Sequence, residues 1–330
     1  MKFKDGLSVQ DIEIERFIFH IVHQDEDQPI LLDETPLGSH KTFFAERILD
    51  TIEGNRFVFN DGSFIHDRLR EIDSNEKVFV KKSKEIAIHF HSFQMDSIKP
   101  GVVILMKIRI DGKPYFSIIK YDHEEVIAYT LDKISSKAIL EDVANSFTKN
   151  KDSLHKSALI SLEKKDGEVL VIDKKVRDDI SKFFKNFLNI KRKYTNEEMT
   201  NTISQITLDV VKDNSEDLPK DFCSSIRRKI FDATQSEDSF SLDGYYEKVF
   251  GLVGNEKIRK SLERHLKKHD LDGEVFKFDK KALSKPRKIK IRTKEGVRIQ
   301  YEDSVSDRVV FSDEGNSQKI TITTERYYEE

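Results

Sequence analysis

The stretch that decides the fold is residues 101–122, GVVILMKIRIDGKPYFSIIKYD. In it, two runs rich in β-branched and aromatic residues flank the dipeptide Asp111-Gly112. Because Asp-Gly suits the tight turn that joins neighbouring antiparallel strands, the stretch predicts a β-hairpin. A second hairpin is predicted for residues 155–173, HKSALISLEKKDGEVLVID, and a further strand for residues 123–131. We therefore expect an antiparallel-rich sheet.

Helices are expected to pack on this sheet, over roughly residues 1–175. Residues 11–32 predict two short extended pieces, and helices are expected over residues 43–53 and just after Gly62. Residues 81–98, KKSKEIAIHFHSFQMDSI, are ambiguous, because their apolar positions fit the period of a strand and also that of a helix. The length of the segment favours a helix.

The composition changes after residue 175. A Phe-rich helix is predicted first, and Thr195 with Glu198 then forms a capping box at the start of another. Further helices are expected to begin at Pro219 and after Asn255. Four strand-like pieces close the chain, at residues 288–292, 297–302, 308–313 and 319–324.

The sequence thus predicts an α+β fold in two domains. The N-terminal domain, residues 1–175, is expected to be an antiparallel-rich sheet with packed helices. The C-terminal domain, residues 176–330, is expected to be a helical layer followed by a β-meander with a basic surface. A chain of 330 residues is long enough for two hydrophobic cores, and its 23 Phe can anchor them.

The bulk composition limits the class of protein. A single cysteine, Cys223, excludes an internal disulfide and a thiolate metal cluster, which fits a reducing cytosol. No apolar run approaches the roughly 20 residues that a membrane-spanning helix needs. The first ten residues, MKFKDGLSVQ, lack the apolar core of a signal peptide. We therefore expect a soluble cytoplasmic protein.

A search for enzyme motifs is negative. The chain has no glycine-rich phosphate loop, dinucleotide fingerprint, nucleophile elbow or zinc-protease motif. His89 and His91 would share a face on a strand, but they diverge by about 200° on the favoured helix. A metal-dependent nuclease needs an acid followed, one strand later, by a Glu-x-Lys motif. Asp73 lies too close in sequence to Glu76 and Lys77 to supply that arrangement. We therefore expect no catalytic residue, no metal site and no cofactor.

Basic residues are concentrated near the C-terminus. Residues 277–294, KFDKKALSKPRKIKIRTK, carry nine Lys or Arg and one acid, although the formal charge of the chain is only −3. Within them Lys288, Lys290 and Arg292 alternate with isoleucines, which places the cations on one face of a strand. Three clusters supply the predicted nucleic-acid-binding side chains: Lys257, Arg259, Lys260, Arg264, Lys267 and Lys268; Arg287, Lys288, Lys290, Arg292, Lys294 and Arg298; and Lys191, Arg192 and Lys193.

Side chains of this kind neutralise phosphates. They bind without strong sequence preference, and their affinity falls steeply with salt. The sequence contains no zinc finger, no RNA-recognition signature and no helix-turn-helix pattern. The alternative interpretation of these clusters is a solvated, lysine-rich surface.

The order of elements resembles the bacterial 37-kDa nucleoid-associated protein family. The similar stretches are residues 14–23, 86–129, 157–189 and 290–323, which follow the family's order over most of the chain. The resemblance implies a cytoplasmic protein of the bacterial nucleoid that binds DNA, has no obvious enzymatic activity and works beside DNA-handling machinery. It supplies no catalytic residues, and the basic residues named above are inferred from charge alone.

Three functions follow as hypotheses. The first is a nucleoid-associated, sequence-tolerant protein that binds duplex DNA through basic patches. The alternative is a protein-interaction component of a DNA-maintenance or anti-phage defence system, and the second alternative is an unrecognised metal-dependent nuclease. Protein partners from DNA-handling machinery are expected, and a homodimer is plausible because symmetric dimers are the commonest oligomers.

Overall fold

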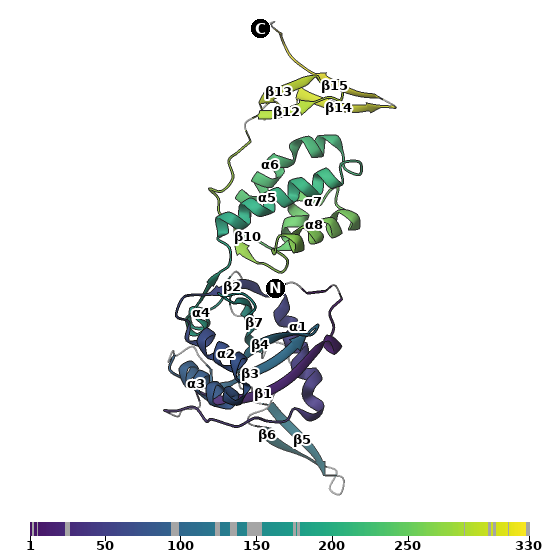
Figure 1. Ribbon diagram of the computed structural model, residues 1–330. Coiled ribbons are helices and arrows are strands. Elements are labelled where there is room, and N and C mark those ends of the chain that lie inside the picture. Colours follow the sequence, from purple (N-terminus) through teal and green to yellow (C-terminus); the bar gives the residue numbers. More distant parts are fainter. Residues whose placement is uncertain are drawn as a thin grey trace. The chain divides into compact units, whose positions relative to one another are not determined.

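The chain divides into two compact units, Met1–Tyr194 (unit 1) and Thr195–Glu330 (unit 2). An antiparallel sheet with helices dominates unit 1, while unit 2 combines helices with short hairpins, so the predicted α+β class is confirmed (Figure 1). No described helix is both long and apolar enough to cross a membrane. This computed structural model describes the whole chain except residues 2, 5, 24–26, 94–98, 123–125, 133–136, 144–153, 174, 175, 177, 178, 287, 303, 304, 306, 307, 316 and 328–330.

Seven strands form the large sheet of unit 1, and every neighbouring pair is antiparallel. Both predicted hairpins are confirmed. At the turn of the first, Asp111 and Gly112 have φ angles of 52° and 76°, the left-handed pair that a two-residue turn of this kind requires. The strands, in their order across the sheet, are β1 (Ile12–Val22), β3 (Gly101–Ile110), β4 (Lys113–Asp122), β7 (Leu154–Ser161), β8 (Glu168–Asp173), β2 (Asn55–Phe59) and β9 (Ile190–Arg192).

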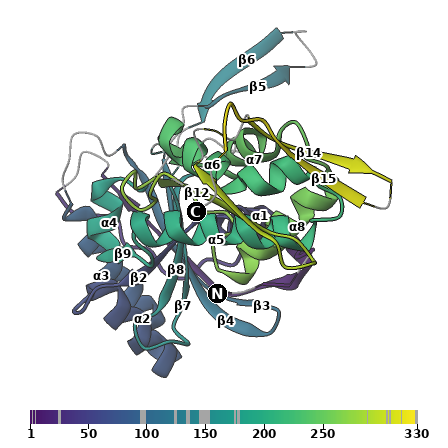
Figure 2. The ribbon, with the colours of Figure 1, turned by 90° about the horizontal axis from the view of Figure 1, so that it is seen from above.

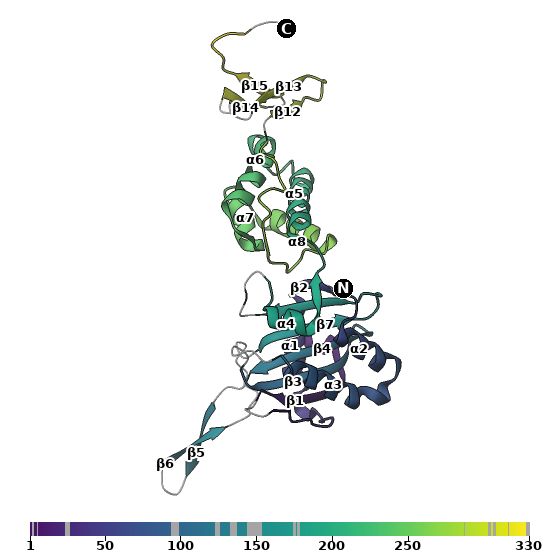
Figure 3. The ribbon, with the colours of Figure 1, turned by 90° about the vertical axis from the view of Figure 1, so that its left-hand side faces the viewer.

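Helices cover both faces of this sheet. The helix α1 (Lys41–Ile52) packs on one face, and α2 (Phe64–Ser74), α3 (Phe79–His91) and α4 (Lys182–Leu188) pack on the other (Figure 3). Side chains of a strand alternate between the two faces. Because both faces are buried, β3 is apolar at nearly every position instead of alternating.

Residues 81–91 of the ambiguous segment lie in the helix α3, as the length of the segment predicted, and residues 94–98 lie outside the described residues. Ile86 and Phe90 are buried on the side of α3 that packs on the sheet. The second extended piece expected before residue 32 is not a strand. Instead, Ile30 makes a single bridge to Ile21, and its segment lies along the outer edge of β1.

Of the strand predicted for residues 123–131, residues 126–131 lie in β5 (Val126–Asp132), and residues 123–125 lie outside the described residues. The strand β5 pairs with β6 (Lys137–Val143), and the two form a sheet of their own (Figure 2). Single turns of 3-10 helix complete unit 1: η1 (Val9–Asp11), η2 (Gly38–His40) and η3 (Glu76–Val78).

The Phe-rich helix belongs to unit 1. Phe183, Phe184 and Phe187 of α4 are buried in the same core as Phe90 of α3, and β9 pairs with β2 at the edge of the sheet. The composition change after residue 175 therefore marks a return from sheet to helix inside unit 1. The border between the units falls between Tyr194 and Thr195.

Unit 2 begins at the predicted capping box, which is confirmed. The Thr195 N–H donates to Glu198 Oε2 over 2.8 Å, and the Glu198 N–H donates to Thr195 Oγ1 over 3.1 Å. The helices expected near Pro219 and Asn255 are also present. The helices are α5 (Asn196–Asp213), α6 (Lys220–Ser236), α7 (Leu242–Phe250) and α8 (Glu256–Lys268), with the short strands β10 (Ser239–Phe240) and β11 (Phe276–Lys277) paired beside them.

The four strands predicted at the end of the chain are present. They are β12 (Lys288–Arg292), β13 (Arg298–Glu302), β14 (Val309–Glu314) and β15 (Ser317–Ile322). They pair two by two, β12 with β13 and β14 with β15, so the described part of the chain ends in two hairpins where a single meander was expected.

Candidate nucleic-acid interface

The hairpin β12–β13 carries the predicted alternation of charge. Lys288, Lys290 and Arg292 are exposed, whereas Ile289 and Ile291 between them are half-buried. The cations therefore occupy one face of β12, because side chains two residues apart point the same way.

The strand register decides which residues of β13 share this face. Lys288 lies opposite Glu302, Lys290 opposite Gln300, and Arg292 opposite Arg298. We call this exposed set of six residues the cationic face. The net charge of the three opposed pairs rises toward the turn. It is zero for Lys288 and Glu302, +1 for Lys290 and Gln300, and +2 for Arg292 and Arg298.

The acid on this face pairs with one cation only. The Lys288 Nζ lies 3.6 Å from Glu302 Oε1. Within the part of the chain that the structure describes, no ion pair involves Lys290, Arg292 or Arg298. Like charges directly opposite each other destabilise a hairpin, and a bound polyanion would offset that repulsion.

The turn of this hairpin extends the positive charge. Lys294 is exposed in a loop that the Thr293 N–H closes by donating to the Val297 carbonyl over 2.9 Å. Gly296 has a φ of +99°, a conformation that favours glycine. Hydrogen bonds from its own backbone N–H and from the Thr293 hydroxyl hold the pKa of Glu295 below its usual value.

The basic residues of α8 differ from those of the cationic face in their ion pairs. Four of them form ion pairs with acids on α8 itself or on neighbouring segments of unit 2, and Lys267 also has an interaction partner. Lys268 is exposed. The pairs are Lys257 with Asp217 (2.6 Å), Lys260 with Glu256 (3.2 Å), Arg264 with Asp213 (3.5 Å), and Arg259 with both Asp243 (2.5 Å) and Glu263 (3.1 Å).

The third predicted cluster lies in unit 1, on and just after β9. Lys191 is exposed, but the Arg192 guanidinium lies over the Phe57 ring, 5.1 Å from its centroid. The Lys193 Nζ donates to Glu168 Oε1 over 3.1 Å. Two of these three cations therefore stabilise the edge of the sheet.

A match to a family model shows which family the chain belongs to. The model described as nucleoid-associated protein YejK matches residues 18–328, nearly the whole chain. The chain belongs to this family. Its members are nucleoid-associated proteins, so the predicted resemblance is confirmed. No curated protein matches the chain in the comparison made.

Among the predicted residues that the structure describes, the cationic face brings together three exposed cations that form no ion pair there, Lys290, Arg292 and Arg298. Arg287 lies outside the described residues. Sequence reasoning missed Gln300, which shares the face with Lys290, because only the strand register shows which residues of β13 lie opposite β12.

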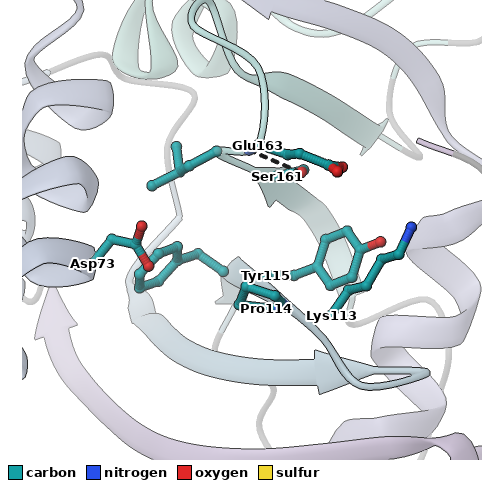
Figure 4. A pocket seen from close by; sticks show the side chains of 8 residues that line it. Asp73, Lys113, Pro114, Tyr115, Ser161 and Glu163 are labelled. Carbon is teal, nitrogen blue, oxygen red and sulfur yellow. Dashed lines mark hydrogen bonds between the residues drawn. The ribbon is translucent and has the colours of Figure 1, made fainter.

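Unit 1 contains a cavity of about 230 Å³ (Figure 4). Asp73, Lys113, Tyr115 and Glu163 line it, and Ser161 Oγ accepts a hydrogen bond from the Glu163 N–H over 3.4 Å. None of the predicted basic residues lies there. Across the described residues, no group of three or more His, Cys, Asp or Glu is arranged to hold a metal ion.

Proposed function

We propose that this member of the nucleoid-associated family binds duplex DNA through phosphate contacts from the cationic face of β12–β13, with little sequence preference. The single observation that carries the proposal is the opposition of Arg292 and Arg298, which are exposed and form no ion pair within the described part of the chain. Two guanidinium groups held side by side favour an anion between them, and family membership makes DNA the expected polyanion.

The geometry also supports a sequence-tolerant mode. Five of the six side chains on the cationic face are charged, and Gln300 is the one neutral side chain that could hydrogen-bond to a base edge. Lysine and arginine contacts to phosphates carry no sequence information directly. Binding is therefore expected to depend mainly on salt concentration and only weakly on base sequence.

The test is a titration with duplex and single-stranded oligonucleotides at two salt concentrations, with and without magnesium. The proposal expects duplex binding at low salt that collapses at high salt, with the DNA left intact. Loss of DNA substrate that requires magnesium would instead support the nuclease alternative. No binding at low salt would overturn the proposal and direct the search to protein partners, beginning with a pull-down after nuclease treatment.

The triple variant K288E/K290E/R292E locates the site. It should abolish duplex binding, because it turns one strand of the cationic face from positive to negative. The control K257E/K260E/R264E makes the same change of net charge on α8, where the cations are already paired with acids. The control should keep most of the binding. Equal loss in both variants would mean that net charge, and not this face, determines affinity.

A further inference from the structure

A polar groove lies between α6 and β12 in unit 2. These two elements are in contact, and the groove between them has a volume of about 380 Å³. Its helical side is formed by residues 223–228 in the first half of α6, including Cys223 and Arg227. Its other side includes Lys288 and Lys290, two members of the cationic face.

The groove is positively charged and no acid is among its described lining residues. Arg227 is exposed and has no ion pair within the described part of the chain. Its neighbour Arg228 differs, because its Nε donates to both carboxylate oxygens of Asp232 over 3.0 and 2.8 Å. Positive charge available to a ligand therefore comes from Arg227 and Lys290, while Lys288 also lies 3.6 Å from Glu302 Oε1.

The serines of the groove do not add free donors. The hydroxyls of Ser224 and Ser225 donate to the Asp221 carbonyl over 2.9 and 2.8 Å. An anion in the groove would therefore be held by the cationic side chains. Lys288 and Lys290 belong to both surfaces, so the groove continues the cationic face from the hairpin onto the helix.

We infer that the groove between α6 and β12 is a second phosphate-binding subsite of the DNA footprint, and that Arg227 contacts a phosphate there. The inference rests on the proposed function and extends it, because it makes the bound polymer span a helix and a hairpin. A duplex presents phosphates at regular short intervals along its axis, so one DNA molecule can occupy the cationic face and the groove together.

The only cysteine of the chain provides a direct probe, because Cys223 lines the groove. Burial raises the pKa of the Cys223 thiol, so alkylation rates are compared at one fixed pH. With the wild-type chain and a short duplex of mixed sequence at low salt, the alkylation rate should fall in proportion to the fraction of chain bound. Raising the salt until the duplex dissociates should restore the rate of the free protein.

Two neighbouring arginines supply the matched variants. Arg227→Ala should weaken duplex binding and lower the slope of log affinity against log salt by about one, as expected for one lost phosphate contact. Arg228→Ala should lower the slope less than Arg227→Ala does, because the Arg228 guanidinium is already paired with Asp232. Both positions lie on the solvent side of the apolar stripe of α6, so circular dichroism should show the same helix content in both variants.

The outcomes separate the inference from the proposed function. Duplex binding that the hairpin triple variant abolishes would support the proposed function. If Cys223 is nevertheless alkylated at the rate of the free protein and Arg227→Ala binds like the wild type, the groove is not a subsite and the proposed function stands. If the duplex does not bind at low salt, the proposed function fails, and the subsite fails with it.

Discussion

Arg292 and Arg298 occupy directly opposed positions on the two strands of the β12–β13 hairpin, and both are exposed. A pair of like charges in this position works against the hairpin in the free protein. The same pair concentrates positive charge close to the turn. An anion bound between the two guanidinium groups would offset this repulsion, as the proposed function requires.

The first prediction separates these two effects with one substitution. Arg298→Gln removes the repulsion, so the free protein should unfold at a slightly higher urea concentration than the wild type. The same variant should bind duplex DNA more weakly, with a salt slope lower by about one. Urea titration and DNA titration measure the two effects. A variant that changes stability but not affinity would show that Arg298 makes no phosphate contact.

The second prediction concerns a gain of binding. Glu302 is the acid that pairs with Lys288 on the cationic face. Glu302→Gln should raise duplex affinity, because it removes a negative charge from the face and frees Lys288 for a phosphate. The measurement is the salt slope, which should increase by about one.

The matched control for this gain lies on the neighbouring hairpin. Glu314 pairs with Lys319 over 3.4 Å, in a hairpin of the same kind. Glu314→Gln changes the net charge by the same amount, but it should leave the salt slope as in the wild type. An equal increase in both variants would assign the gain to net charge and remove support for a local site.

The third prediction tests the border between the units. Phe184 is fully buried in the core of unit 1, so Phe184→Ala should lower its free energy of unfolding by about 3–5 kcal/mol. Lys182→Ala, on the exposed side of the same helix, should have little effect. A fragment of residues 1–194 should fold cooperatively, whereas residues 1–175 should not, because they lack α4 and β9. Equal stability of the two fragments would contradict the border at Tyr194.

Local signals in the sequence accounted for much of the fold. The Asp111-Gly112 turn, the Thr195 and Glu198 capping box and the start of α8 after Asn255 each depend on residues close together in the chain, so the pattern alone predicts them. The strand β2 was missed because its five residues gain their partners, β8 and β9, from distant segments. The unit border was displaced for the same reason, since burial of α4 depends on contacts with α2 and α3.

The candidate site shows the same division. Alternation along β12 predicted correctly that Lys288, Lys290 and Arg292 share a face. Sequence charge could not distinguish these cations from those of α8, because pairing of Lys257 with Asp217 and of Arg264 with Asp213 depends on tertiary packing. The groove beside α6 could not be predicted from the sequence either, because it also depends on tertiary packing.

The last prediction concerns acid stability and begins with the histidine at the edge of the sheet. Burial, with a smaller contribution from the positive charge of Lys84, lowers the pKa of His20 to about 4. The Leu32 N–H donates to His20 Nδ1 over 3.1 Å, so the proton of the neutral ring is on Nε2, which lies 3.2 Å from Ser83 Oγ. Protonation of Nδ1 would break this hydrogen bond, which together with the Ile30–Ile21 bridge holds the segment around Leu32 against β1.

The pH range of this effect follows from the two pKa values. In the unfolded chain His20 binds a proton near pH 6.5, whereas in the folded chain it does so near pH 4. Stability should therefore be complete above pH 6.5, fall as the pH drops from 6.5 to 4, and lose nothing more from this group below pH 4. The loss attributable to His20 is about 3 kcal/mol, since one pKa unit corresponds to about 1.4 kcal/mol.

Urea titrations at pH 7.5 and pH 4.5 measure this loss. His20→Asn keeps an acceptor near Leu32 but cannot take up a proton, so it should lose less stability between the two pH values than the wild type does. Burial and the nearby charges of His91 and Lys120 lower the pKa of His23 to about 4. His23 therefore titrates in the same range in both proteins, and its effect cancels in the comparison. His40→Asn, at an exposed position, should behave like the wild type. Identical pH dependence in His20→Asn and the wild type would show that the contact of His20 with Leu32 does not control acid stability.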